Sequence, residues 1–308
     1  MNNLPARWAP PPVLILMLGS TLWGTTWIWL KAIDNLGVGP LLLSVLAYGA
    51  QFVLLLPWVV PPLLKRLRQP GHPPLAWRWL LPLALLSGIS GVGFTIAMVF
   101  GDVVRAMLLF FLIPAWGVIF GRIFLGEALT AIRLIAVIFA LAGAAIILGP
   151  DLRFEDNLSF SLADGAALIA GLALAGANVL FRYLQAEPML FKLSVMQIGA
   201  VLFALGALLL FPEPIATLTI NGLLQSLAYG ATLLLGAMLA TQYAVERLPS
   251  GRSAVLMTLE LVVASLTAIW IGHEQPSIMV WLGGGMILAA ALLEATSQQP
   301  DQIIGQSA

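Results

Sequence analysis

Residues 105–129 read RAMLLFFLIPAWGVIFGRIFLGEAL, and residues 252–276 read RSAVLMTLELVVASLTAIWIGHEQP. The two stretches align without a gap at a constant offset of 147 positions, which places Glu127 opposite Glu274. In both stretches an apolar segment leads to the glutamate, and one further apolar segment follows it. A pattern that recurs in this way indicates an internal repeat. The sequence therefore predicts one structural unit that occurs twice.

The composition is that of a chain that lies in lipid. Hydrophobic residues make up 60% of its 308 residues and charged residues only 9%, with a mean hydropathy of +1.00. Soluble domains carry about 25% charged residues. The formal net charge is zero, so nothing in the charge balance indicates nucleic acid as a partner. We therefore expect an integral membrane protein that binds no nucleic acid.

Apolar segments that can cross a hydrocarbon core of about 30 Å as helices recur ten times. They are residues 13–31, 40–60, 79–100, 104–121, 132–149, 162–184, 189–211, 221–244, 253–272 and 277–295. Because each unit has an odd number of spans, the second unit must enter the membrane in the opposite orientation. The predicted fold is all-α, with ten transmembrane helices in two inverted five-helix repeats, residues 13–149 and 162–295.

The distribution of Lys and Arg predicts the orientation. The N-terminus, the even-numbered connections and the C-terminus hold Arg7, Lys65, Arg66, Arg68, Arg78, Arg122, Arg133, Arg182, Lys192, Arg247 and Arg252. The opposite side holds Lys31, Arg105 and Arg153. Because positive residues accumulate on the cytoplasmic side, eleven against three places both termini in the cytoplasm.

Short motifs fall at characteristic places in the first unit. They are Leu22-Trp23-Gly24-Thr25-Thr26 in the first span, Pro114 in the fourth, Leu125-Gly126-Glu127 after it and Ala142-Gly143-Ala144 in the fifth. In these motifs, and in its duplicated order of ten spans, the chain resembles the EamA-type transporters of the drug/metabolite transporter superfamily. The resemblance covers about residues 13–148 and 162–295.

The second unit departs from this pattern at three places. Leu261 occupies the position that matches Pro114, His273 replaces Gly126, and Ala175-Gly176 stands where the first span has Trp-Gly. These departures leave the expected fold intact, but they argue against a strictly symmetric motion of the two units.

The resemblance implies a secondary transporter of the bacterial cytoplasmic membrane that works by alternating access. Spans one, three, four, six, eight and nine would surround a central cavity. Within the superfamily the chain resembles YddG-type amino-acid exporters, so the expected substrate is a neutral or aromatic amino acid. The expected partners are this small molecule and membrane lipid, with the chain a monomer or a weak homo-oligomer.

Nucleotide-sugar carriers and other exchangers of phosphorylated metabolites are the alternative within the superfamily. Their substrates carry two or more negative charges and need several cationic groups in the cavity. In this sequence the cationic residues near the spans, Lys31, Arg105, Arg182 and Arg252, stand at span ends rather than deep inside. The amino-acid exporter is therefore the preferred interpretation.

An intramembrane enzyme and a channel are the remaining alternatives. The sequence has no Cys, two His, and no HExxH, GxSxG or Walker-type motif, so we expect neither catalysis nor a metal or cofactor. A channel needs a continuous polar lining, and no span shows a polar stripe.

Spans one and six each carry a glycine beside a short polar side chain near mid-membrane. In span one these residues are Gly24 and Thr26, and in span six Asn178 follows Gly176. Glycine allows a ligand to approach, and Thr26 and Asn178 can form hydrogen bonds with it. Trp23 and Trp27 lie one turn apart and are candidates for a cavity wall. Close helix packing is the alternative for all of them.

Aromatic residues precede a proline in span four. Phe110 and Phe111 are candidate binding residues, and Pro114 is a candidate hinge because it removes one helical hydrogen bond. Met257 occupies the matching register of span nine.

Span three has a loosely packed stretch of small residues. Ser90 and Phe94 are candidate binding residues, and Gly91 and Gly93 are candidate hinges, with close helix packing as the alternative.

Charged residues at the two mouths are candidates for gates. Asp102 and Arg105 lie three residues apart at the outer side, and Arg252 lies at the inner side. The alternative is that these charges are simply solvated, in which case a surface pair contributes little energy.

Glu260 is the only ionisable residue well inside a span. A charged carboxylate at the bilayer centre costs on the order of 2.5–3.5 kcal/mol on insertion scales, so it needs a partner, water or protonation. One hypothesis is that Glu260 faces the cavity and binds the substrate's ammonium group or a coupling proton. The alternative is a bond to a neighbour such as Thr258, Asn178 or Gln242, which would only fix packing.

Overall fold

The computed structural model describes residues 11–68, 77–125, 130–148, 160–184, 186–214, 218–245, 256–257 and 259–297. Glu127, Arg252 and Thr258, named above, lie outside these ranges. Throughout the described ranges the regular secondary structure is helical and no strand occurs. The all-α prediction is therefore confirmed for this part of the chain.

The helices follow one another with short connections. In chain order they are α1 (Pro12–Gly24), α2 (Thr26–Asp34), α3 (Pro40–Arg68), α4 (Trp77–Phe100), α5 (Val103–Phe110), α6 (Ile113–Leu125), α7 (Ala131–Leu148), α8 (Leu162–Tyr183), α9 (Met189–Leu210), α10 (Ile220–Tyr229), the π-helical turn η3 (Gly230–Leu234), α11 (Leu235–Val245), α13 (Leu259–Trp270) and α14 (Ile278–Ser297). Within the described residues, seven segments are long and apolar enough to cross a membrane, and α7, α13 and α14 are shorter apolar helices. The count of ten spans stays a prediction.

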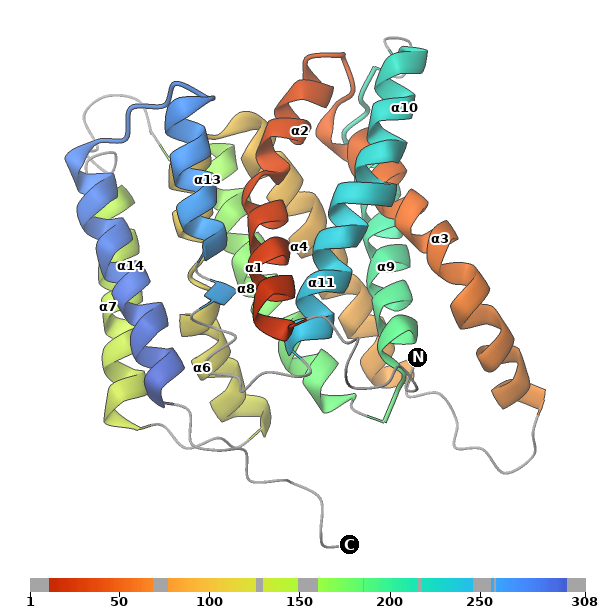
Figure 1. The fold of residues 1–308 in the computed structure, drawn as a ribbon, viewed down its shortest axis with the longest axis horizontal. Coiled ribbons are helices and arrows are strands. Elements are labelled where there is room, and N and C mark those ends of the chain that lie inside the picture. The colour runs from red at the N-terminus through yellow and green to blue at the C-terminus, as the bar shows by residue number, and fades with distance from the viewer. Residues whose placement is uncertain are drawn as a thin grey trace, which may run out of the picture.

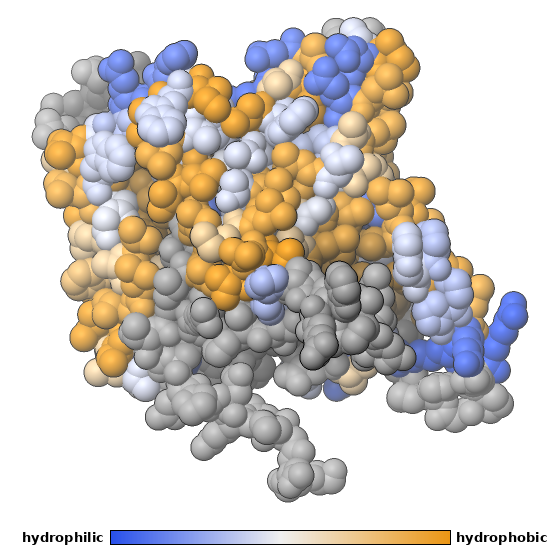
Figure 2. All heavy atoms as spheres, in the orientation of Figure 1, coloured by the Kyte–Doolittle hydropathy of each residue, from blue (hydrophilic) through white to orange (hydrophobic). Residues whose placement is uncertain are grey.

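The helices stand side by side in one bundle (Figure 1). α7 packs on α14 at one edge, and α3 and α10 lie at the opposite edge. Between them, α1 contacts α11 and α13, and α8 contacts α4 and α6. Figure 2 shows apolar residues over most of the described surface of this face, with hydrophilic residues along its upper edge. Such a band is what a surface in contact with lipid requires.

The first predicted span is interrupted at Thr25, which the sequence did not predict. α1 ends at Gly24 and α2 begins at Thr26. The Thr25 hydroxyl donates a hydrogen bond to the Leu22 carbonyl oxygen at 2.9 Å, and the Thr26 hydroxyl donates to the Trp23 carbonyl oxygen at 2.7 Å. The two threonines therefore satisfy backbone carbonyls at the break, where an unpaired polar group would be costly in lipid.

The fourth predicted span is interrupted as well. α5 ends at Phe110 and α6 begins at Ile113, so Pro114 is the second residue of α6. Proline has no N–H, so the Phe110 carbonyl, four residues earlier, lacks its usual helical donor. The kink expected at Pro114 coincides with this break, and its role as a hinge stays a prediction.

The third predicted span shows no such break. α4 is helical from Trp77 to Phe100, through both Gly91 and Gly93. A Cβ atom at Gly91 would lie 2.7 Å from the Tyr48 hydroxyl, and one at Gly93 would lie 3.1 Å from the Ala166 carbonyl oxygen. Both glycines thus allow neighbouring helices to approach closely. This geometry favours the packing interpretation over the hinge interpretation.

A carboxylate from one connection holds the start of a distant helix. Glu213 accepts hydrogen bonds from the backbone N–H groups of Leu41 and Leu42, both at 2.9 Å. These donors are at the N-terminus of α3, where a negative charge is favourable. A Cβ atom at Gly39 would overlap the Glu213 carboxylate, so this position needs glycine.

Replacing Glu213 by alanine is expected to lower the stability of the protein by about 1 kcal/mol, the typical cost of losing a helix cap. The measurement is thermal unfolding in detergent. Gln225→Ala is the control, because the Gln225 side chain forms an exposed hydrogen bond to Asn221 one turn away and caps no helix among the described residues. Equal unfolding temperatures for the two variants would contradict the capping role.

Candidate functional site

The break in the first span meets the first turn of α13. A Cβ atom at Gly24 would lie 2.7 Å from the Glu260 carbonyl oxygen and 2.8 Å from the Val263 Cβ atom. The backbones of α1 and α13 therefore touch at Glu260. This contact puts the Trp23-Gly24-Thr25-Thr26 motif beside the one ionisable residue that the sequence places deep in a span.

The Glu260 side chain is buried, with 8% of the residue exposed. Among the residues that the structure describes, no side chain donates a hydrogen bond to its carboxylate or pairs with it, and Asn178 and Gln242 are no exceptions. Burying a carboxylate without a partner is costly. An ionisable residue retained inside a membrane under that cost is a candidate for binding a substrate or an ion.

A second glycine contact resembles the first. A Cβ atom at Gly171 of α8 would lie 2.5 Å from the Phe110 carbonyl oxygen, the group that Pro114 leaves without a helical donor. Gly171 lies five residues before Gly176, the glycine that the sequence analysis matched to Gly24, so the two contacts are similar but not in the same register. In the first contact, the interrupted span supplies the glycine, Gly24, which packs on a carbonyl of α13. In the second, the interrupted span supplies the carbonyl, that of Phe110, on which Gly171 of α8 packs.

Most of the predicted aromatic residues belong to one cluster. The rings of Phe94 and Phe110 lie 4.9 Å apart between centroids, and those of Phe110 and Phe111 lie 6.1 Å apart. Trp27 is a buried member of the same cluster, and Trp23 packs against it. The structure therefore brings together the aromatic residues that the sequence drew from spans one, three and four.

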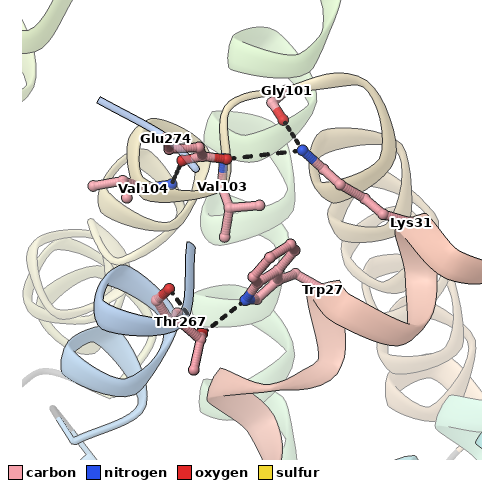
Figure 3. A network of polar contacts seen from close by, with 8 residues as sticks. Trp27, Lys31, Gly101, Val103, Val104, Thr267 and Glu274 are labelled. Atoms are coloured by element: carbon pink, nitrogen blue, oxygen red, sulfur yellow. Dashed lines mark hydrogen bonds and ion pairs between the residues drawn. The ribbon is translucent and has the colours of Figure 1, made fainter. Parts of the chain in front are cut away.

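Trp27 is fixed in place by a polar contact that the sequence analysis missed. Its indole Nε1–H donates to the Thr267 hydroxyl oxygen at 2.9 Å, and the Lys31 ammonium lies 5.9 Å from the ring centroid (Figure 3). Thr267 lies seven residues after Glu260, which puts both on one face of α13. The spacing of seven residues between Glu260 and Thr267 was the sequence signal that could have identified Thr267.

The other predicted binding residues are more scattered. Ser90 is 5% exposed within α4, and Thr26 is 1% exposed with its hydroxyl bonded locally. Asn178 is exposed, although it lies two turns after Gly171 on the same face of α8. Met257 is half-buried just before α13. Their roles in binding stay predictions.

The gate hypothesis paired Arg105 with Asp102, but the structure does not show that pair. The Nε and Nη2 atoms of Arg105 bond to the two carboxylate oxygens of Asp164, at 2.8 and 3.0 Å, because the first turn of α8 reaches the guanidinium group. Asp164 also accepts from the Ser161 N–H in a capping box. Asp102 is exposed and, with Glu274, lines a cavity of about 350 Å³.

Glu274, from the repeated motif, holds the N-terminal end of α5. Its carboxylate oxygens accept from the backbone N–H groups of Val103 at 2.7 Å and Val104 at 3.0 Å (Figure 3). The Lys31 ammonium lies 3.8 Å from the same carboxylate and donates to the Gly101 carbonyl oxygen at 3.1 Å. The sequence marked Glu274 as part of the repeat but did not predict these partners.

Comparisons with known proteins agree with this architecture. A solved crystal structure that is 20% identical superposes with a TM-score of 0.61 and covers 92% of this chain and 95% of its own, which shows a shared fold. A protein of Streptantibioticus cattleyicolor, described as a probable terminal-alkyne amino-acid exporter, is 25% identical over 229 residues. That alignment covers 69% of this chain and 72% of the relative.

The EamA-like transporter family matches residues 11–149 and again residues 161–295. These two segments leave only the ends of the chain and a short connection unmatched. With apolar helices of membrane-spanning length, the match describes a multi-pass membrane transporter of small molecules rather than an enzyme. The chain belongs to the EamA-like transporter family, within the drug/metabolite transporter superfamily that its motifs indicated.

Proposed function

We propose that this protein exports small neutral amino acids, aromatic ones included, from the bacterial cytoplasm by alternating access. The observation that carries the proposal is Glu260, a buried carboxylate without a partner among the described residues, which lies where α13 meets the break between α1 and α2. The distant relative described as an amino-acid exporter supports the same substrate class.

The chemistry of an amino acid matches this site. The substrate's ammonium group would pair with the Glu260 carboxylate, and an apolar side chain would lie against the cluster of Trp23, Phe94 and Phe110. The N-terminal end of α2 follows the break at Thr25. Because half-helix N-termini carry a partial positive charge, the substrate's carboxylate would lie there.

Phosphorylated metabolites fit this arrangement less well. Such substrates need several cationic groups around one cavity. Lys31 and Arg105, the two cations described at the outer end, are paired with Glu274 and Asp164. A cavity for a nucleotide sugar would have to break both pairs.

Alternating access would use the two halves of the chain as inverted five-helix repeats with both termini in the cytoplasm. Besides the two glycine contacts, residues 43–50 read LSVLAYGA and residues 193–200 read LSVMQIGA. The hydroxyl groups of Ser44 and Ser194 each donate to the carbonyl four residues earlier, in α3 and α9. Matching local contacts in both halves support the repeat, and the excess of Lys and Arg supports the orientation.

The test is a counterflow panel in proteoliposomes that contain the purified protein. We expect labelled phenylalanine and other neutral amino acids to accumulate against their unlabelled counterparts, while nucleotide sugars and sugar phosphates do not. Robust exchange of a nucleotide sugar, with no amino-acid counterflow, would replace this proposal with the phosphorylated-metabolite exchanger.

A further inference from the structure

Two short helices form the outer ends of interrupted spans. α2 has nine residues and follows the break at Thr25, and α5 has eight residues and precedes the break at Phe111 and Leu112. A segment next to a break can change its angle without disturbing the helix beyond it. α2 and α5 are therefore the parts of the first half best able to move independently at the outer end.

One side chain joins both short helices to the second half. Glu274, in the connection between α13 and α14, accepts two hydrogen bonds from the N-terminus of α5 and pairs with Lys31 of α2. Lys31 in turn reaches the Gly101 carbonyl oxygen, just before α5 (Figure 3). If Glu274 leaves, α5 loses these two hydrogen bonds and α2 loses its ion pair to the α13–α14 connection, while Trp27 of α2 still bonds to Thr267 of α13.

We propose that Glu274 and Lys31 form the outer gate of the transporter, closed in this structure, and that substrate release requires them to separate. The proposal rests on the alternating access of the proposed function. It assigns the gate to residues other than Asp102 and Arg105.

The ion pair of the gate is weaker than the neighbouring ion pair between Arg105 and Asp164. The Lys31–Glu274 pair spans 3.8 Å, and 34% of the Lys31 side chain is exposed. The Glu274 side chain is 13% exposed, so the pair is partly exposed, and a long pair of this kind is easily exchanged for water. Arg105 and Asp164 instead form a two-bond ion pair with 18% and 5% of their side chains exposed. Such a pair is costly to open, so it holds α5 to α8 while the gate opens.

Glu213 offers a matched control within the same chain. It caps α3 through the same pair of backbone bonds with which Glu274 caps α5. α3, however, is one uninterrupted helix of 29 residues. Removing the charge of Glu213 therefore loosens a cap without releasing a short, hinged segment.

The experiment uses the absence of native cysteine, so that a single introduced thiol reports alone. Ala264→Cys places the thiol in the fully buried middle of α13, below the gate. A membrane-impermeant thiol reagent is added from the outer side, and the rate at which it labels this thiol is measured. The parent is Ala264→Cys alone, and it is compared with Ala264→Cys combined with Glu274→Gln, with Lys31→Gln or with Glu213→Gln. We expect both gate variants to label about threefold faster than the parent, the ratio that corresponds to the loss of one partly exposed ion pair. Glu213→Gln should label at the parent's rate.

A locking measurement completes the test. In Lys31→Cys/Glu274→Cys, a short bifunctional thiol reagent should abolish amino-acid counterflow, and reduction should restore it. Unchanged counterflow after complete cross-linking, or equal labelling of the Glu274→Gln and Glu213→Gln variants, would overturn the gate. The labelling arm needs no substrate, so it distinguishes a failed gate from a wrong substrate class: a parent chain that moves no amino acid, yet labels as expected, refutes only the proposed substrate.

Discussion

Glu260→Gln is expected to reduce amino-acid counterflow by about a hundredfold while leaving the protein as stable as before, or more so. Removing one partner of a desolvated charge pair costs roughly 2–5 kcal/mol, so losing the Glu260 carboxylate should cost most of the binding of the substrate's ammonium group. The fold, in contrast, gains from the change. A buried carboxylate without a partner among the described residues is replaced by a neutral amide of the same size.

The measurements are counterflow in proteoliposomes and thermal unfolding in detergent. Glu213→Gln is the control, because it removes a carboxylate that caps a helix. It should lower the unfolding temperature and have a smaller effect on counterflow. The opposite pattern for Glu260→Gln, a lower unfolding temperature with normal counterflow, would assign Glu260 to packing instead of binding.

The second large effect concerns the ion pair between α5 and α8. Arg105→Gln is expected to destabilise the protein by about 3 kcal/mol, because it leaves the Asp164 carboxylate buried without its cation. Adding Asp164→Asn should recover part of that loss, since the double variant no longer buries an unpaired charge. Thermal unfolding in detergent of the two single variants and the double variant measures this coupling.

Lys31→Gln is the control for this series. The long, partly exposed Lys31–Glu274 pair should contribute less than about 1 kcal/mol, so this variant should unfold close to the parent. Additive losses in the Arg105 and Asp164 series, without recovery in the double variant, would show that the two residues do not act as a pair.

Features that depend on local sequence were predictable. Pro114 removes a backbone donor wherever it stands in a helix, so the break between α5 and α6 followed from one residue. Glu260 was singled out by its place in an apolar span, and the structure buries it with 8% of the residue exposed. The aromatic residues of spans one, three and four were singled out one by one, and the structure gathers them in one cluster.

Features that depend on contacts between distant segments were not predictable. Arg105 was assigned to Asp102, three residues away, but its partner Asp164 lies 59 positions along the chain. The break at Thr25 is accompanied by threonine hydroxyl bonds to the Leu22 and Trp23 carbonyl oxygens and by the packing of Gly24 against α13. Glycines 91 and 93 suggested flexibility, whereas Tyr48 and Ala166 fill the space beside them. Sequence spacing alone carries none of this information.

The central claim is that the buried carboxylate recognises the ammonium group of an amino acid beside an aromatic cluster. The most direct measurement is competition in phenylalanine counterflow by unlabelled phenylalanine and by 3-phenylpropanoate, which has the same ring and carboxylate but no ammonium group. We predict that phenylalanine competes and that 3-phenylpropanoate does not. Equal competition by the two compounds would contradict the account, because recognition would then not involve the charge that Glu260 supplies.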